Sequence, residues 1–102
     1  MTITVKALYE RVQNDPSLVW IDVRTTDEFK AERPNTPIVK NLPLDQINTF
    51  SCPKDQDVYV SCRSGKRSQA AKNILIASGY NHVFNVTGGF IAWESENLPV
   101  IR

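Results

Sequence analysis

Residues 57–79 read DVYVSCRSGKRSQAAKNILIASG, and this stretch combines a strand, a loop and a helix. The apolar run at its start predicts a buried strand over 57–61. The spacing of the apolar residues after the loop predicts a helix over 68–78, and Gly79 stands where a helix commonly ends. A strand that leads through a short loop into a helix is typical of α/β sheets.

The same alternation continues on both sides of this stretch. Apolar runs predict further strands over 18–23 and 83–86, and helical spacing predicts a helix over 5–12 with Thr4 as its N-cap. The remaining segments are predicted to be short helices that start at Thr26 and span 44–50 and 90–94, and a proline-rich irregular connection over 33–43 with at most a short strand near Ile38 and Val39. We therefore predict a single α/β domain, residues 1–102, with a mainly parallel sheet.

Composition and charge limit the possible functions. The chain has 102 residues, 12 basic and 11 acidic side chains and a net charge of +1. Its 41% hydrophobic and 23% charged residues are ordinary for a globular domain and exclude a disordered or fibrous chain. Without a basic excess, neither nucleic acid nor membrane is an expected partner. No apolar stretch could span a bilayer and the first residues do not resemble a signal peptide, so we expect a cytoplasmic protein.

The two cysteines, Cys52 and Cys62, are expected to be free thiols in such a protein. His82 is the single histidine and there is no CxxC pair, so we expect no metal site and no cofactor. A redox pair of Cys52 with Cys62 is an alternative, but Cys52 lies in a polar turn before Pro53 and is better interpreted as a peripheral thiol.

The chemistry is expected at Cys62, at the carboxyl end of the predicted strand, where open α/β sheets bind ligands. N–H groups of the loop and of the first helical turn lack helical partners and can point at one spot. Arg63, Lys66 and Arg67 add three positive charges within five residues, with no acid among them. This arrangement favours an anion, and it predicts a pKa of Cys62 below that of a free thiol. Gly65 is expected to let the loop curl through a positive φ.

Four motifs, in order along nearly the whole chain, resemble those of the rhodanese-like sulfurtransferases. The loop Cys62-Arg63-Ser64-Gly65-Lys66-Arg67-Ser68 is similar to the family's active-site loop, in which a cysteine opens a six-residue cradle. The other three motifs are Ile21-Asp22-Val23-Arg24 with Glu28-Phe29, Asn41-Leu42-Pro43-Leu44, and Gly88-Gly89-Phe90-Ile91-Ala92-Trp93 with Leu98-Pro99-Val100.

The resemblance implies a five-stranded, mainly parallel sheet flanked by helices on both faces. It also implies a thiosulfate sulfurtransferase, in which a sulfane sulfur moves from a small anionic donor to Cys62 and then, as a persulfide, to cyanide, a thiol or a protein acceptor. The residues suit this reaction, because a thiolate attack that releases sulfite needs no general acid. Cys62 is the expected nucleophile, and the expected substrate-binding residues are Arg63, Ser64, Gly65, Lys66, Arg67 and Ser68.

One segment departs from the family pattern. Between Phe29 and Asn41 the family usually carries Gly-His-Ile and then Gly-Ala, whereas residues 30–40 here lack the histidine and both glycines. We expect this change to affect the local backbone and one wall of the pocket, and to leave the cysteine loop intact.

Two other functions fit part of the pattern. A cysteine phosphatase or arsenate reductase has a similar cradle, but it typically carries an arginine where this chain has Ser68, and Arg67 comes one residue too early. The histidine that often precedes the cysteine in those enzymes is Ser61 here. The other alternative is a persulfide carrier or binding module that delivers sulfur to a partner protein without acting as an enzyme.

Several conspicuous residues outside the loop have structural interpretations. Trp20 and Trp93 lie in apolar runs and are expected in the core. Asp22 is expected to accept hydrogen bonds from backbone near the site, and Arg24 to pair with an acid. Glu28 is interpreted as a negative charge that favours the N-terminus of a helix.

Overall fold

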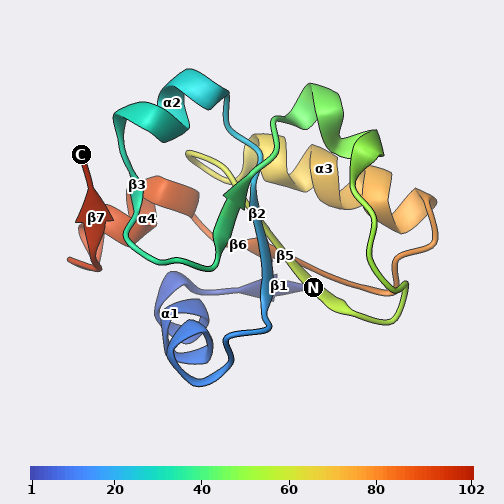
Figure 1. The fold of residues 1–102 in the computed structure, drawn as a ribbon, viewed down its shortest axis with the longest axis horizontal. Coiled ribbons are helices and arrows are strands. Elements are labelled where there is room, and N and C mark those ends of the chain that lie inside the picture. The colour runs from blue at the N-terminus through green and yellow to red at the C-terminus, as the bar shows by residue number, and fades with distance from the viewer.

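The computed structural model describes residues 1–102, and a five-stranded sheet lies at its centre (Figure 1). Every strand pairing in this sheet is parallel, and the strand order is β1-β6-β5-β2-β4. The strands are β1 (Thr2–Ile3), β2 (Val19–Asp22), β4 (Val39–Asn41), β5 (Asp57–Ser61) and β6 (His82–Val86). The predicted α/β fold with a five-stranded parallel sheet is confirmed.

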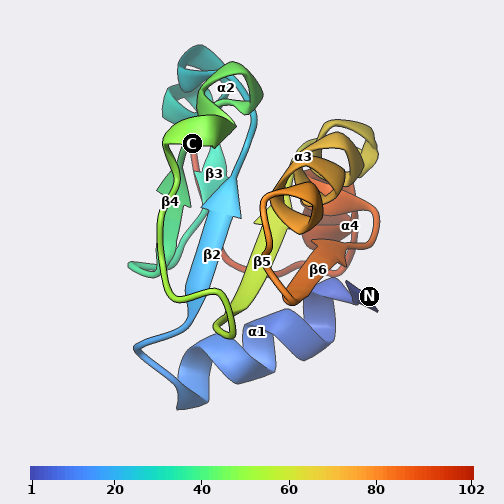
Figure 2. The ribbon, with the colours of Figure 1, turned by 90° about the vertical axis from the view of Figure 1, so that its right-hand side faces the viewer.

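Helices cover both faces of the sheet (Figures 1 and 2). They are α1 (Val5–Asn14), α2 (Thr26–Ala31), the 3₁₀ helix η1 (Leu44–Thr49), α3 (Lys66–Ala77) and α4 (Gly89–Ser95). On one face, Leu8 of α1 and Phe90 of α4 belong to one apolar core. On the other face, Leu75 of α3 and Ile47 of η1 belong to a second. Because both faces are covered, the central strands are apolar almost throughout.

Strand β5 is the most protected strand and it positions the cysteine. It lies between β6 and β2, and Val58 and Val60 have no exposed surface. Its register with β2 pairs Ser61 with Asp22, so the two strands end side by side. The chain therefore delivers Cys62 and the segment after Asp22 to the same carboxyl edge of the sheet, beside α2 (Figure 2).

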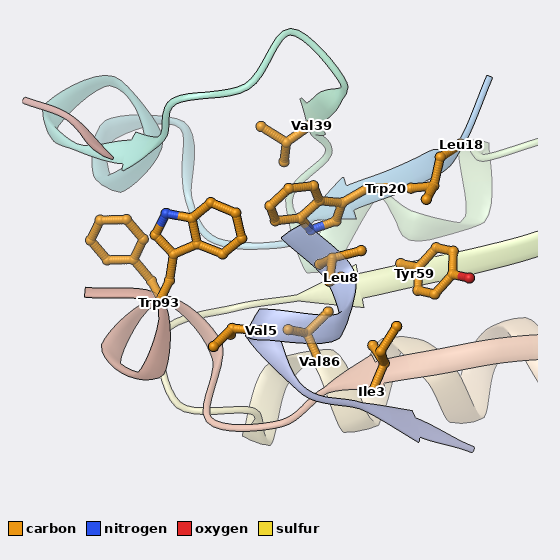
Figure 3. Close-up of a cluster of buried hydrophobic side chains, with 10 residues drawn as sticks. Ile3, Val5, Leu8, Leu18, Trp20, Val39, Tyr59, Val86 and Trp93 are labelled. Atoms are coloured by element: carbon orange, nitrogen blue, oxygen red, sulfur yellow. The ribbon is translucent and has the colours of Figure 1, made fainter. Parts of the chain in front are cut away.

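Two tryptophans join the sheet to the helices on the α1 and α4 face (Figure 3). The ring centroids of Trp20 and Trp93 are 5.4 Å apart, and Tyr9 packs edge-on against Trp93 at 5.6 Å. Each buried indole N–H finds an acceptor: Trp20 donates to the Ser61 hydroxyl oxygen at 2.8 Å, and Trp93 to the Pro99 carbonyl at 2.6 Å. The prediction that both tryptophans are core residues is confirmed.

Three strands of two residues each were not predicted. One is β1, which pairs with β6 at the edge of the main sheet. The other two, β3 (Arg33–Pro34) and β7 (Val100–Ile101), form a small antiparallel pair of their own. Two residues are too few to show the alternation by which a strand is recognised in a sequence.

The predicted elements lie close to their expected bounds, with one informative difference at α3. This helix begins at Lys66, two residues before the predicted start at position 68, because Gly65 with φ 108° serves as its N-cap. The predicted N-cap Thr4 is confirmed, since its hydroxyl oxygen accepts from the Ala7 N–H at 3.2 Å. Helix α2 begins at Thr26 as predicted. No helix has both the length and the apolar character that a membrane crossing requires.

The atypical segment 30–40 reaches the back of the site. It contains β3, whose Pro34 lines a small hollow together with Ser61, Gly89 and Phe90. The Asn35 N–H donates to the Pro99 carbonyl oxygen at 2.8 Å, which ties the segment to the C-terminal part of the chain. The segment thus lines this hollow next to Ser61, the residue before Cys62, and its effect on the wall of the site stays a prediction.

Candidate active site

The loop after Cys62 is held from behind by the first residues of α4. The Phe90 N–H donates to the carbonyl oxygen of Cys62 at 2.8 Å, and the Ile91 N–H donates to that of Arg63 at 3.1 Å. In a trans peptide unit the C=O and N–H point in opposite directions. Fixing these two carbonyls toward α4 therefore turns the N–H groups of Arg63 and Ser64 the other way, and the Ser64 N–H is among those that interact with the thiol.

This close contact requires a glycine at position 89. A Cβ there would lie 2.3 Å from the Cys62 carbonyl oxygen and 2.7 Å from that of Arg63. Gly89 also has a positive φ of 54°, which favours glycine independently of the available space. The family-like Gly88-Gly89 motif is thus part of the frame of the cysteine loop.

The sulfur of Cys62 is buried and lies among hydrogen-bonding groups. The residue is 1% exposed, the Gly65 N–H donates to Sγ at 3.1 Å, and Ser68 Oγ lies 3.3 Å from Sγ. Burial acts to raise the pKa of Cys62, but hydrogen bonds from the Ser68 hydroxyl and from the N–H groups of Ser68, Gly65 and Ser64 lower it. The hydrogen bonds outweigh burial, so the pKa of Cys62 lies below its usual value, in the predicted direction.

The three basic residues of the loop differ from one another. Arg63 and Lys66 are exposed, and neither forms an ion pair. Arg67 forms a two-point ion pair with Glu28 of α2, with Nη1–Oε1 at 2.6 Å and Nη2–Oε2 at 3.0 Å. The loop segment itself contains no acid, but folding brings Glu28 from another helix to Arg67, so one of the three cations is already paired.

Glu28 is fixed in place by the helix that carries it. Its Oε1 accepts from the N–H and from the hydroxyl of Thr25, both at 3.1 Å, as one half of a capping box. The hydrogen bonds from Arg67 lower the pKa of Glu28 to about 2, against the opposing effect of burial and with help from Thr25. Glu28 is ionised at neutral pH, so it does more than favour the start of a helix: it neutralises one of the loop's cations.

The remaining loop residues divide between surface and interior. Ser64 is exposed, and its backbone N–H is the part that serves the sulfur. Gly65 curls the loop through its positive φ, as predicted. Ser68 has no exposed surface, and its hydroxyl oxygen lies 3.3 Å from Cys62 Sγ. The structure thus places the Gly65 N–H and the Ser68 hydroxyl within hydrogen-bond distance of the Cys62 sulfur, whereas Arg63 and Lys66 are exposed at the surface of the loop.

Asn85 is a site residue that the sequence interpretation missed. It lies on β6 and its Oδ1 is 2.6 Å from Ser68 Oγ, while its Nδ2 donates to the Gly65 carbonyl oxygen at 3.1 Å. A second hydrogen bond from Nδ2 reaches Gln69 Oε1 at 3.3 Å. The one available signal was an asparagine in an otherwise apolar strand, between Phe84 and Val86.

A buried ion pair supports the chain beside the loop. Arg24 lies 2.9 Å from Asp22 through Nη2 and Oδ2, and the Arg24 backbone N–H also donates to Asp22 Oδ1 at 2.9 Å. The guanidinium donates to the Glu32 carbonyl oxygen at 2.9 Å and stands over the ring of Phe90, 4.7 Å from its centroid. Both expectations for this pair are confirmed, and the pair links the end of β2 to the C-cap of α2 and to α4.

The second cysteine, Cys52, lies in a different environment from Cys62. Cys52 is a free, half-buried thiol whose Sγ lies 3.5 Å from the Pro53 carbonyl oxygen. Burial raises the pKa of Cys52, with smaller opposing and supporting effects of Lys54 and Asp55. The two thiols of the chain are therefore shifted in opposite directions, and only Cys62 is adapted to ionise.

Comparison with known proteins places this fold and loop in one family. The model of the rhodanese-like domain matches residues 4–96, and the chain belongs to this family. A sulfurtransferase of Allochromatium vinosum is 33% identical over 99 residues, covering 97% of this chain and 92% of the relative. Thiosulfate sulfurtransferase 18 of Arabidopsis thaliana is 38% identical over 96 residues, covering 79% of this chain and 70% of the relative. A Bacillus subtilis protein, whose name proposes it as a sulfur carrier, is 30% identical over 92% of this chain and 51% of its own length.

Solved structures agree with this assignment. A rhodanese-like domain protein of Staphylococcus aureus is 31% identical, has a TM-score of 0.78 and matches the full length of both chains. The rhodanese-like domain of an Anabaena protein has a TM-score of 0.85 at 22% identity, covering 98% of this chain and 77% of that one, and shows the shared fold. The names of the relatives support sulfur transfer as the general activity of this family.

Proposed function

We propose that the chain is a sulfurtransferase of the thiosulfate type with Cys62 as its nucleophile. The thiolate attacks the outer sulfur of thiosulfate, a bond forms between the two sulfurs, and the sulfur–sulfur bond of the donor breaks to release sulfite with the electron pair. The observation that carries this proposal is a buried sulfur that accepts from loop N–H groups, with no acid or base hydrogen-bonded to it. Such a site stabilises sulfur anions and cannot deliver the proton that many other leaving groups need.

In the second step a nucleophile takes the sulfur. The acceptor attacks the terminal sulfur of the persulfide, the bond to Cys62 Sγ breaks, and the thiolate returns to its hydrogen bonds with the loop. Cyanide, a small thiol or a protein thiolate can act as the acceptor by the same displacement. We propose no metal or other cofactor for either step, because no proton or electron has to be supplied beyond those that the two sulfur compounds bring.

The loop residues have separate roles in this proposal. Arg63 and Lys66, exposed at the rim, attract the anionic donor. Arg67 orients the anionic donor through the guanidinium N–H groups that its ion pair with Glu28 does not occupy. The N–H groups of Ser64, Gly65 and Ser68 hold the sulfur itself. We further propose that residues 1–102 act as one domain in the cytoplasm, with neither nucleic acid nor membrane as a partner.

A persulfide carrier is the second candidate. It is favoured by the Bacillus subtilis relative and by the exposed Arg63 and Lys66, which a protein acceptor could contact directly. A carrier would load sulfur on Cys62 in the same way. It would then turn over poorly with cyanide or small thiols and transfer sulfur rapidly to its partner protein.

Intact-mass measurement before and after treatment with thiosulfate tests the proposal. We expect a gain of one sulfur atom that cyanide removes, that persists in Cys52→Ser and that is absent in Cys62→Ser. A gain that depends on Cys52 would contradict the assignment of the nucleophile. No gain with thiosulfate or with a small persulfide donor, from protein that is shown to be folded, would contradict sulfur transfer altogether.

A further inference from the structure

The buried hydroxyl of Ser68 lies between two groups that both interact with it. Ser68 Oγ is 2.6 Å from Asn85 Oδ1 on one side and 3.3 Å from Cys62 Sγ on the other. A serine hydroxyl has one proton to donate, although it can accept from two directions. The direction of that proton decides what Ser68 can do for the sulfur.

The backbone fixes which way round the Asn85 amide lies. The Gly65 carbonyl oxygen, 3.1 Å from Nδ2, can only accept a hydrogen bond. Turning the amide over would set two acceptor oxygens against each other at that distance. The amide nitrogen therefore faces Gly65, and the carbonyl oxygen of Asn85 faces Ser68.

It follows that Ser68 gives its proton to Asn85. An amide oxygen cannot donate, so the 2.6 Å contact requires the hydroxyl to do so. The lone pairs of Ser68 then face Cys62. In this arrangement Ser68 accepts a hydrogen bond from the neutral thiol, and it can donate to the thiolate only by giving up its hydrogen bond to Asn85.

We propose that Asn85 is a positioning residue for the nucleophile: its carbonyl oxygen competes with the Cys62 sulfur for the single hydroxyl proton of Ser68. When Cys62 loses its proton to solvent, the hydroxyl turns from Asn85 to the sulfur. When a persulfide forms, Sγ no longer carries the charge, and the hydroxyl returns to Asn85. This inference rests on the proposed role of Cys62 as the nucleophile, and it assigns Asn85 control over how readily that thiolate forms.

No charged group around the site is part of this competition. Arg67 of α3 interacts electrostatically with Cys62 and is paired with Glu28 of α2, and Asp22 at the end of β2 is paired with Arg24. On the β6 side the thiol is faced through Ser68 by Asn85, which is uncharged. Substitutions at positions 68 and 85 therefore leave both ion pairs in place.

The test is a double-mutant cycle on the pKa of Cys62. We would titrate the ultraviolet absorbance of the thiolate in Cys52→Ser protein, where Cys62 is the only thiol, and in the same protein with Ser68→Ala, Asn85→Ala or both. No sulfur donor is present, so the result does not depend on whether the proposed reaction occurs. Thermal unfolding of each variant checks that it is folded, and Asn85→Leu replaces Asn85→Ala if that variant fails.

The two single substitutions are expected to have opposite effects. Ser68→Ala removes a hydrogen-bond donor and raises the pKa of Cys62, whereas Asn85→Ala frees that donor and lowers the pKa by about one unit, the order of one hydrogen bond to a charged group. With Ser68 already replaced, Asn85→Ala no longer lowers the pKa. If Asn85→Ala instead raised the pKa equally with and without Ser68, Asn85 would act only as a tether for Gly65, and the proposal would be overturned.

Discussion

The sulfur of Cys62 owes its lowered pKa to hydrogen bonds from its own loop more than to the charges of neighbouring side chains. Most of these donors are backbone N–H groups, which are fixed in place by folding and do not titrate. Their effect acts at contact distance inside a buried site, where salt screens little. This differs from a loop that holds its anion mainly with exposed arginines and lysines.

The pH dependence of sulfur loading should follow this lowered pKa. The loading rate with thiosulfate is expected to rise as Cys62 ionises and to level off at a lower pH than the alkylation of a free small thiol does. The midpoint of this pH dependence should move little between low and high salt. It is measured on Cys52→Ser protein by quenching the loading reaction at set times and determining the protein mass. A midpoint that climbs steeply with salt would show instead that Arg63 and Lys66 control the thiolate.

The Glu28–Arg67 ion pair should limit the use of a dianionic donor. Glu28→Gln frees the Arg67 guanidinium, so kcat/KM for thiosulfate is expected to rise several-fold, mainly through a lower KM. Asp27→Asn is the matched control, because this exposed acid lies in the same helical turn and forms no ion pair. Arg67→Ala should act in the opposite direction and weaken the use of thiosulfate. Equal kinetics for Glu28→Gln and wild type would contradict this limit.

The stabilising effect of the Glu28–Arg67 ion pair depends on pH. Because folding lowers the pKa of Glu28 from its usual 4.5 to about 2, the pair contributes to stability above pH 4.5 and loses that contribution as the pH falls toward 2. The effect of Glu28→Gln on thiosulfate use should therefore be constant across neutral pH.

Helix α4 acts on the cysteine loop through backbone contacts. Gly89→Ala would force a Cβ to within 2.3 Å of a loop carbonyl, so it should lower the free energy of unfolding by more than about 2 kcal/mol and reduce sulfur loading in the protein that still folds. Gly79→Ala is the control: it also has a positive φ, but its Cβ would meet only the side chain of Lys54, at 3.9 Å. We expect it to cost about 1 kcal/mol with normal loading, measured by urea denaturation. Similar effects of the two substitutions would show that backbone strain, and not the contact with the loop, governs position 89.

The sequence predicts the elements well where each carries its own pattern. Strand 57–61 and the helix that ends before Gly79 are visible because their apolar periodicity and end signals lie within a few residues. Contacts between elements leave no such pattern. Glu28 meets Arg67 across 39 positions, and Asn85 meets Ser68 across 17, so neither pairing could be deduced from spacing alone. The short strands β3 and β7 were missed for the same reason, since they are defined only by each other.

Substitutions in the α1 and α4 core should lower the stability of the protein without changing the rate at which Cys62 is loaded with sulfur. Leu8 has no exposed surface and belongs to the α1 and α4 core, away from the helix that carries Arg67 and Ser68. Leu8→Ala is expected to lower the free energy of unfolding by about 2–5 kcal/mol while the folded fraction loads sulfur at the normal rate. Ile76→Ala, at a position 49% exposed, should change stability little. A loading defect in folded Leu8→Ala protein would show that the two cores are coupled.

The bonds from Phe90 and Ile91 to the carbonyls of Cys62 and Arg63 also set the order in which the protein becomes reactive during synthesis. A ribosome makes Cys62 well before it makes Gly88 to Ile91, and β1 likewise waits for its partner β6. Until those later residues emerge, the loop carbonyls have no partners and the thiol lacks its frame. The frame of the thiol is therefore completed only after residues 88–91 have emerged and have packed against the loop.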